Sequence, residues 1–159
     1  MVITAMNIQC DSLKCNNNCC SAFSGISSHL TPFGKLACFS DIILTNEDYQ
    51  LLIKAGYAEF IEIGEEGLKK LKTLKDGCCC AYQQGKCTIY ENRPTICRAY
   101  PFYIDIFAGL CVINDCPSAP NNDRIIEYAE DIKTVLAVYK YWIEYYERIL
   151  NSADDNEQG

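Results

Sequence analysis

The sequence predicts a small α+β fold, rich in cysteine, with short hairpins and short helices followed by one long amphipathic helix. Three observations predict it. Cysteine occurs twelve times in 159 residues, and histidine occurs once. Glycine and proline interrupt the middle of the chain at short intervals, as turns between short elements require. Over the last third, apolar residues recur in alternating steps of four and three, the spacing of a helix with an apolar seam.

A short helix is predicted at about 46–55. Thr45 and Asp48 form a capping box at its start, and Gly56 can end it. The next residues, "AEFIEIG" at 58–64, alternate as a strand does. Residues 65–75 fit neither the helical nor the strand period, and their structure is left open.

Two hairpins and a short helix are predicted farther along. "AYQQGKCTIY" (81–90) has a Gln-Gly turn between possible strands, and "FYIDIFAGLCVI" (102–113) has Ala108-Gly109 between two apolar strands. Pro94 can open a short helix that carries Cys97, and Pro101 can close it. The prolines therefore fix the direction of the chain around this cysteine.

The long helix is predicted at about 122–150. Its apolar seam consists of Ile125, Ala129, Ile132, Leu136, Tyr139, Ile143, Tyr146 and Leu150. A second apolar row flanks the seam at Ile126, Val135, Trp142 and Ile149. The seam can pack on the rest of the domain, on a partner chain, or on both. Because aromatic residues gather near the end of the helix, we expect a homodimer or a protein partner at 135–150.

Residues 1–150 are expected to form a single domain, with a core at about 10–118 before the long helix. The last residues, "NSADDNEQG" at 151–159, are acidic and lack a large apolar side chain, which predicts a disordered tail.

Charge and hydropathy limit the possible partners. The formal net charge is −7, which argues against nucleic acid because a phosphate backbone is met by clustered lysine and arginine. No segment has the uncharged apolar length of a membrane span, and the first residues lack the pattern of a signal peptide. We therefore expect a cytoplasmic protein without membrane contact.

Cysteine thiolates are the main candidates for metal ligands. In a reducing compartment, a cysteine-rich chain is more often a metal protein than a disulfide scaffold. Four thiolates suit either tetrahedral zinc or an iron–sulfur cluster. The paired C-x-x-C motifs typical of zinc sites are absent, and the spacing of Cys10, Cys15 and Cys19 comes within one residue of a plant-ferredoxin pattern. The spacing is a hint toward iron.

The candidate ligands form an N-terminal and a later group. They are Cys10, Cys15, Cys19 and Cys20, then Cys87, Cys97 and Cys116 with one of the consecutive Cys78, Cys79 and Cys80. Cys38 and Cys111 lie in apolar stretches and are interpreted as small buried hydrophobes. Arg93 and Arg98 can donate hydrogen bonds to a thiolate site and offset its charge, although surface ion pairs are their commoner use.

The stretch "GKCTIYENRPTICRAYPF" (85–102), followed by "DCP" (115–117), resembles the zinc- or iron-chelating cysteine-cluster family often called YkgJ-like. The positions that match this motif are Cys87, Tyr90, Arg93, Pro94, Cys97, Arg98 and Pro101, with Cys116 as the late cysteine. The resemblance favours Cys79 as the upstream ligand. The N-terminal cysteines depart from the family's C-x-x-C-x-x-C-C pattern.

The resemblance implies metal binding. Eight cysteines, namely Cys10, Cys15, Cys19, Cys20, Cys79, Cys87, Cys97 and Cys116, would supply up to two sites with four ligands each. An iron–sulfur cluster, of the [4Fe–4S] type, is the expected cofactor, and zinc is the alternative. The expected role is an accessory, electron-transfer or metal-carrying module. The alternative is a metal-dependent enzyme of the methyltransferase or redox type, related to flagellin lysine methylases.

Overall fold

The computed structural model describes residues 20, 42–64, 67–114, 116–120 and 128–157, and confirms the predicted α+β class. The helices are α1 (Asn46–Lys54), α2 (Thr95–Ala99) and α3 (Ala129–Glu157), with 3-10 turns η1 (Ala58–Phe60) and η3 (Tyr90–Asn92). The strands are β1 (Ile61–Ile63), β2 (Lys69–Leu71), β3 (Tyr82–Gln83), β4 (Lys86–Cys87), β5 (Phe102–Asp105) and β6 (Gly109–Val112). They form three antiparallel two-stranded hairpins within the described residues.

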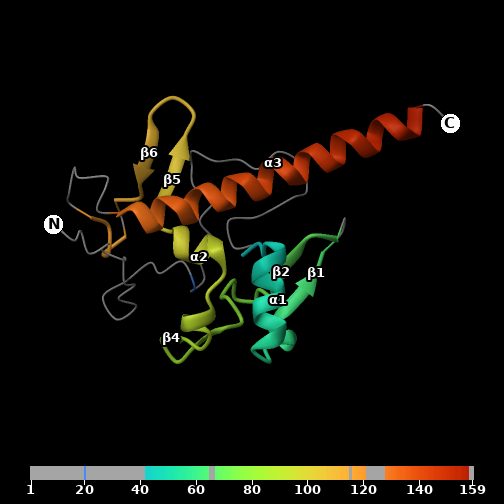
Figure 1. Ribbon diagram of the computed structural model, residues 1–159. Coiled ribbons are helices and arrows are strands. Elements are labelled where there is room, and N and C mark those ends of the chain that lie inside the picture. Colours follow the sequence, from blue (N-terminus) through green and yellow to red (C-terminus); the bar gives the residue numbers. More distant parts are fainter. Residues whose placement is uncertain (1–19, 21–41, 65–66, 115, 121–127, 158–159) are drawn as a thin grey trace.

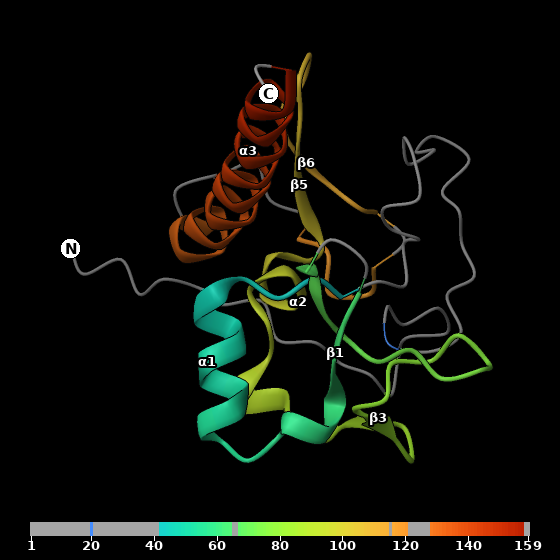
Figure 2. The same ribbon diagram turned by 90° about the vertical axis from the view of Figure 1, so that its right-hand side faces the viewer.

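In Figure 1 the long helix α3 crosses the molecule, with the β5–β6 hairpin above it and α2, α1 and the β1–β2 hairpin below it. The helix α2 packs along α3, and the β5–β6 hairpin stands against the N-terminal half of α3. The helix α1 and the β1–β2 hairpin lie on the other side of α2, as the view turned by 90° also shows (Figure 2). The C-terminal end of α3 extends beyond the other elements (Figure 1).

The helix α1 forms as its capping residues predict. Thr45 Oγ1 accepts a hydrogen bond from Asp48 N, and Asp48 Oδ2 accepts one from Thr45 N, each at 3.1 Å. The helix buries Leu52 against Leu44, Leu71 and Ile89. Its predicted range is confirmed to within one residue at the C-terminal end.

The segment after α1 differs from the prediction in part. Residues 58–60 form the 3-10 turn η1, and only 61–63 are extended. The segment whose structure was left open supplies β2, which pairs with β1. Leu68 and Leu71 are buried there, whereas Leu74 is exposed, so the three leucines share no common face.

The two predicted hairpins are present. In β3–β4 the turn lies at Gln84 and Gly85, whose φ angles of 50° and 77° are the left-handed values that a tight two-residue turn needs. In β5–β6 the turn residues are 106–108 instead of Ala108-Gly109, because Gly109 pairs with Asp105. Asp105 Oδ1 accepts hydrogen bonds from Phe107 N and Ala108 N at 2.8 Å, which moves the turn toward Asp105.

The start of α2 differs from the prediction by one position. Pro94 is the N-cap residue, and Thr95 is the first helical residue. Pro94 lacks a side-chain oxygen that could cap the helix, so the acceptor for this helix end comes from elsewhere in the chain.

The helix α3 is described from Ala129 to Glu157, so residues 151–157 are helical where a disordered tail was expected. Continuing an existing helix adds one hydrogen bond for each residue that is fixed, which favours extension even without apolar side chains. The predicted N-terminal part of the helix, 122–128, lies mostly outside the described residues. None of the described helices has the length and apolar character that crossing a bilayer requires.

The face that α3 turns toward the core includes only part of the predicted seam, namely Ile132 and Tyr139, which pack against the core. Val135 and Tyr145 are 1% and 4% exposed, whereas the seam residues Leu136 and Ile143 are 52% and 59% exposed. Val135 packs with Ala99 and Phe102. Because Val135 and Val138 have short side chains, α2 can approach α3 closely on this face. The row that was expected to flank the seam therefore faces inward at Val135.

Adjacent positions on α3 provide a test of this orientation. Val135→Ala should lower the free energy of unfolding by about 2 kcal/mol, because it removes buried methyl groups and leaves a cavity. Leu136→Ala should lower it by less than about 1 kcal/mol. Chemical denaturation of dilute protein with equal metal content measures both values. A larger loss for Leu136→Ala would contradict the orientation.

Candidate metal centre

Four of the predicted ligands come together from separate segments. Cys79 follows the β1–β2 hairpin, Cys87 ends β4, and Cys97 lies in the middle of α2. Cys20 joins them from the N-terminal part of the chain, where its carbonyl oxygen accepts a hydrogen bond from Cys79 N at 2.9 Å. The thiols of Cys20, Cys79 and Cys87 all raise the pKa of Cys97 by charge repulsion, so the four lie within electrostatic range of one another.

Burial and mutual repulsion disfavour thiolates in this group. Burial is the main reason that the pKa of Cys97 lies well above its ordinary value, and repulsion from the other three thiols raises it further. Burial also raises the pKa of Cys87, followed by repulsion from Cys20 and Cys79. The negative charges of these thiolates are unfavourable because they are buried and repel one another. A bound metal cation would offset those charges. By residue type, these four thiols are the donors that zinc and iron–sulfur clusters take.

The consecutive cysteines 78–80 have different surroundings. Cys80 is buried with Leu44 and Leu52, and its thiol donates to Phe60 O at 3.5 Å. Cys79 is half-buried, and its charge acts on both Cys87 and Cys97. A hydrogen bond with the Cys80 thiol and burial raise the pKa of Cys79. The structure thus brings Cys79 toward the group and leaves Cys80 as a core residue.

The remaining predicted ligands are Cys116 and three N-terminal cysteines. Cys116 is half-buried in the loop after β6, where its N–H donates to Ile113 O at 3.2 Å. Cys10, Cys15 and Cys19 lie outside the described residues. Within the described stretches, no three His, Cys, Asp or Glu side chains are arranged so that they could hold a metal ion as they stand. The full ligand set therefore stays a prediction.

Arg93 lies beside the thiols. Its positive charge lowers the pKa of both Cys87 and Cys97, which opposes the effect of burial. The side chain is held by a hydrogen bond from Nε to Tyr90 O at 2.9 Å and by stacking on the Tyr90 ring at 3.6 Å. The predicted use of Arg93 as a compensating charge for a cofactor stays a prediction.

Arg98 has different contacts. Its Nη2 donates to Thr95 Oγ1 at 3.1 Å and lies 3.8 Å from Asp48 Oδ1. These contacts belong to the start of α2. The predicted role of Arg98 toward a cofactor stays a prediction.

A buried carboxylate was missed as a site residue. Asp48 is 2% exposed and accepts hydrogen bonds from Thr95 N at 3.0 Å and from Thr95 Oγ1 at 2.8 Å. It thereby fixes the start of α2, two residues before Cys97. The sequence identifies Asp48 as a capping residue of α1 but carries no signal for a partner 47 residues away.

The comparison with protein families decides the class of protein. A family model named CxxCxxCC, described as "Putative zinc- or iron-chelating domain", matches residues 9–129. The chain belongs to the CxxCxxCC family. The matched range includes all eight cysteines predicted as ligands, and family membership supports metal binding through cysteine. Searches of curated proteins and of solved structures found no match.

Asp48→Asn tests whether this carboxylate positions Cys97. The change should lower the free energy of unfolding by about 2 kcal/mol, because a charged acceptor for Thr95 is lost. It should also lower metal content after dialysis against a chelator, measured by elemental analysis. Leu68→Ala is the control, because Leu68 is buried in a separate cluster with Ile43 and Tyr145. Equal metal loss in both variants would indicate that Asp48 acts only through stability.

Metal binding should release protons and strengthen as pH rises. The raised pKa values keep the thiols of Cys87 and Cys97 protonated at neutral pH, and metal must displace these protons. Calorimetric titration with zinc in buffers of different ionisation enthalpy measures the number released. Cys97→Ser should reduce that number. A binding affinity that is independent of pH between 6 and 8 would contradict the expectation.

Proposed function

We propose that this protein holds an iron–sulfur cluster of the [4Fe–4S] type, with zinc as the alternative, and acts in the cytoplasm as an accessory, electron-transfer or metal-carrying module. The observation that carries the proposal is the grouping of Cys20, Cys79, Cys87 and Cys97. These residues come from four separate segments, so ordinary local packing gives no reason for their thiols to share one neighbourhood.

One site uses this group of four. Cys10, Cys15, Cys19 and Cys116 remain as the ligands of a second site. In the first site, the metal draws the four thiolates together and replaces their protons, because ligand deprotonation and local folding are coupled to metal binding. Arg93 offsets part of the negative charge of the thiolates and limits repulsion among them.

The position of the four cysteines also explains how the cofactor would stabilise the fold. Cys87 and Cys97 lie on either side of η3, and Cys79 precedes the β3–β4 hairpin. A shared metal would link these short elements, none of which has the length to be stable alone. The metal therefore has a structural as well as a carrier role.

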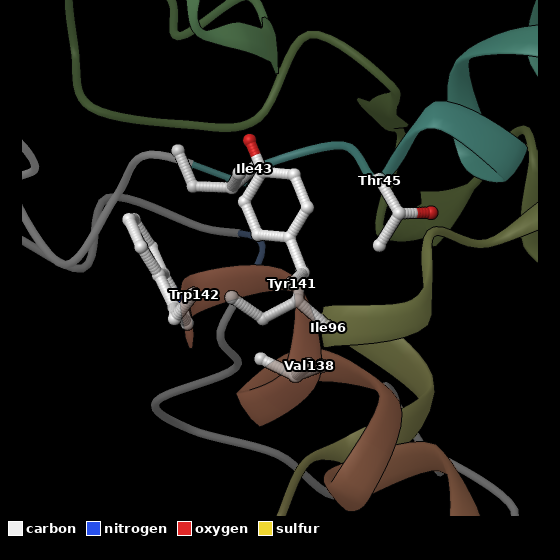
Figure 3. A pocket seen from close by; sticks show the side chains of 6 residues that line it. All are labelled: Ile43, Thr45, Ile96, Val138, Tyr141 and Trp142. Carbon is white, nitrogen blue, oxygen red and sulfur yellow. The ribbon is translucent and has the colours of Figure 1, made fainter. Parts of the chain in front are cut away.

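Within the part of the chain that the structure describes, a small pocket lies beside α2 and α3. It is lined by Ile43, Thr45, Ile96, Val138, Tyr141 and Trp142, mostly apolar side chains (Figure 3). Its cavity volume of about 10 Å³ is sufficient for one water molecule at most.

Anaerobic purification followed by metal and sulfide analysis tests the proposal. Brown protein with acid-labile sulfide supports the cluster, whereas colourless protein with stoichiometric zinc supports the alternative. Cys97→Ser should remove the metal of one site and about half of the total, because it deletes one of four ligands.

Cys111→Ser is the matched control, because Cys111 lies on β6 opposite Tyr103 and outside the proposed sites. It should retain full metal content. A well-folded wild-type protein that contains no metal after anaerobic purification would refute the proposal.

A further inference from the structure

The helix α3 carries an apolar row that its own domain leaves exposed. Leu136, Ile143 and Leu150 follow one another at intervals of seven residues and are 52%, 59% and 66% exposed. We call these three residues the outer row. The inward side of the same helix has its own apolar residues, including the buried Val135 and Tyr145. The outer row therefore contributes little to the core of this chain.

The spacing of the outer row suits a partner helix. Apolar residues that repeat every seven positions stay aligned along a second helix when the two helices supercoil. From Leu136 to Leu150 the row is about 21 Å long, at about 1.5 Å per residue. This length corresponds to two heptads, enough for a short helix pair.

Charged residues beside the outer row indicate the direction of the partner. At the same interval of seven, the sequence places Lys133, Lys140 and Glu147. The two lysines come first along the helix, and the acid follows. In an antiparallel copy this row lies against its own equivalent, lysine opposite acid, whereas in a parallel copy it faces Val135, Trp142 and Ile149 and forms no charge pairs.

We propose that α3 pairs with α3 of a second copy of this chain in an antiparallel arrangement. The two-fold axis passes beside Ile143, so that Ile143 contacts its symmetry mate and Leu136 contacts Leu150 of the second copy. Lys140 then lies close to Glu147 of the second copy, and the reverse pair forms by symmetry.

The contacts that α3 already makes within its own chain are compatible with this pairing. Lys140 is paired with Glu144 of its own helix at 3.7 Å, but both side chains are largely exposed, and such pairs exchange at little cost. The outer row faces away from the core, and the C-terminal end of α3 extends beyond the other elements (Figure 1). The pairing is independent of the proposed metal chemistry and concerns a different surface.

Sedimentation equilibrium of the full metal-loaded chain tests the pairing. The wild type should form a concentration-dependent dimer, and Ile143→Asp should make it monomeric with unchanged metal content. Phe107→Asp is the control, because Phe107 is 92% exposed at the tip of β5–β6 and away from the outer row. A wild type that stays monomeric, or a dimer that persists in Ile143→Asp, would overturn the proposal.

Charge reversal tests the direction. Lys140→Glu and Glu147→Lys should each weaken the dimer at least tenfold, and the double variant should restore it, because the pairs re-form with opposite signs. Lys75→Glu, an exposed turn residue, controls for the change in net charge. Failure of the double variant to recover would exclude the antiparallel register. A photo-crosslinking residue at position 136 should link to the region of Leu150, whereas a link between two copies of position 136 would indicate a parallel pair.

Discussion

The buried carboxylate of Asp48 connects the two short helices on which the candidate metal centre depends. Its oxygen atoms accept hydrogen bonds from Thr45 N at the start of α1 and from Thr95 N at the start of α2. Pro94 offers no side-chain cap, and a helix of five residues leaves most of its N–H groups without partners inside the helix. Asp48 therefore acts as a long-range N-cap, and the orientation of Cys97 follows from it.

The position of α2 relates the candidate metal centre to the rest of the molecule. One side of this helix carries Cys97 toward the other thiols, and its last residue, Ala99, is buried with Val135 of α3. The strand β5 follows α2 in the chain and is held to α3, because Ile104 N donates to the hydroxyl of Tyr139 at 3.1 Å. A displacement of α2 would thus affect both the thiols and the inner face of α3.

Local patterns in the sequence predicted the elements well and their contacts poorly. The capping box of α1 and the turn at Gln84-Gly85 were predictable because each depends on neighbouring residues. The inward face of α3 was not, because Val135 and Leu136 belong to adjacent apolar rows and both rows fit a helix. At the candidate site, residue type identified the thiols. Their grouping, and the partnership of Asp48 with Thr95, depend on contacts between distant segments that spacing does not encode.

The three consecutive cysteines at 78–80 have a consequence for mutational tolerance. Cys79 faces the thiol group, while Cys80 is buried among leucines, where its sulfur serves as a small apolar group. Because both roles suit cysteine, a shift that moves Cys78 into the place of Cys79 and Cys79 into the place of Cys80 still presents one thiol to the group and one sulfur to the core. A single-residue insertion in the preceding loop is thereby buffered at this position, whereas a deletion would put Ala81 in the place of Cys80.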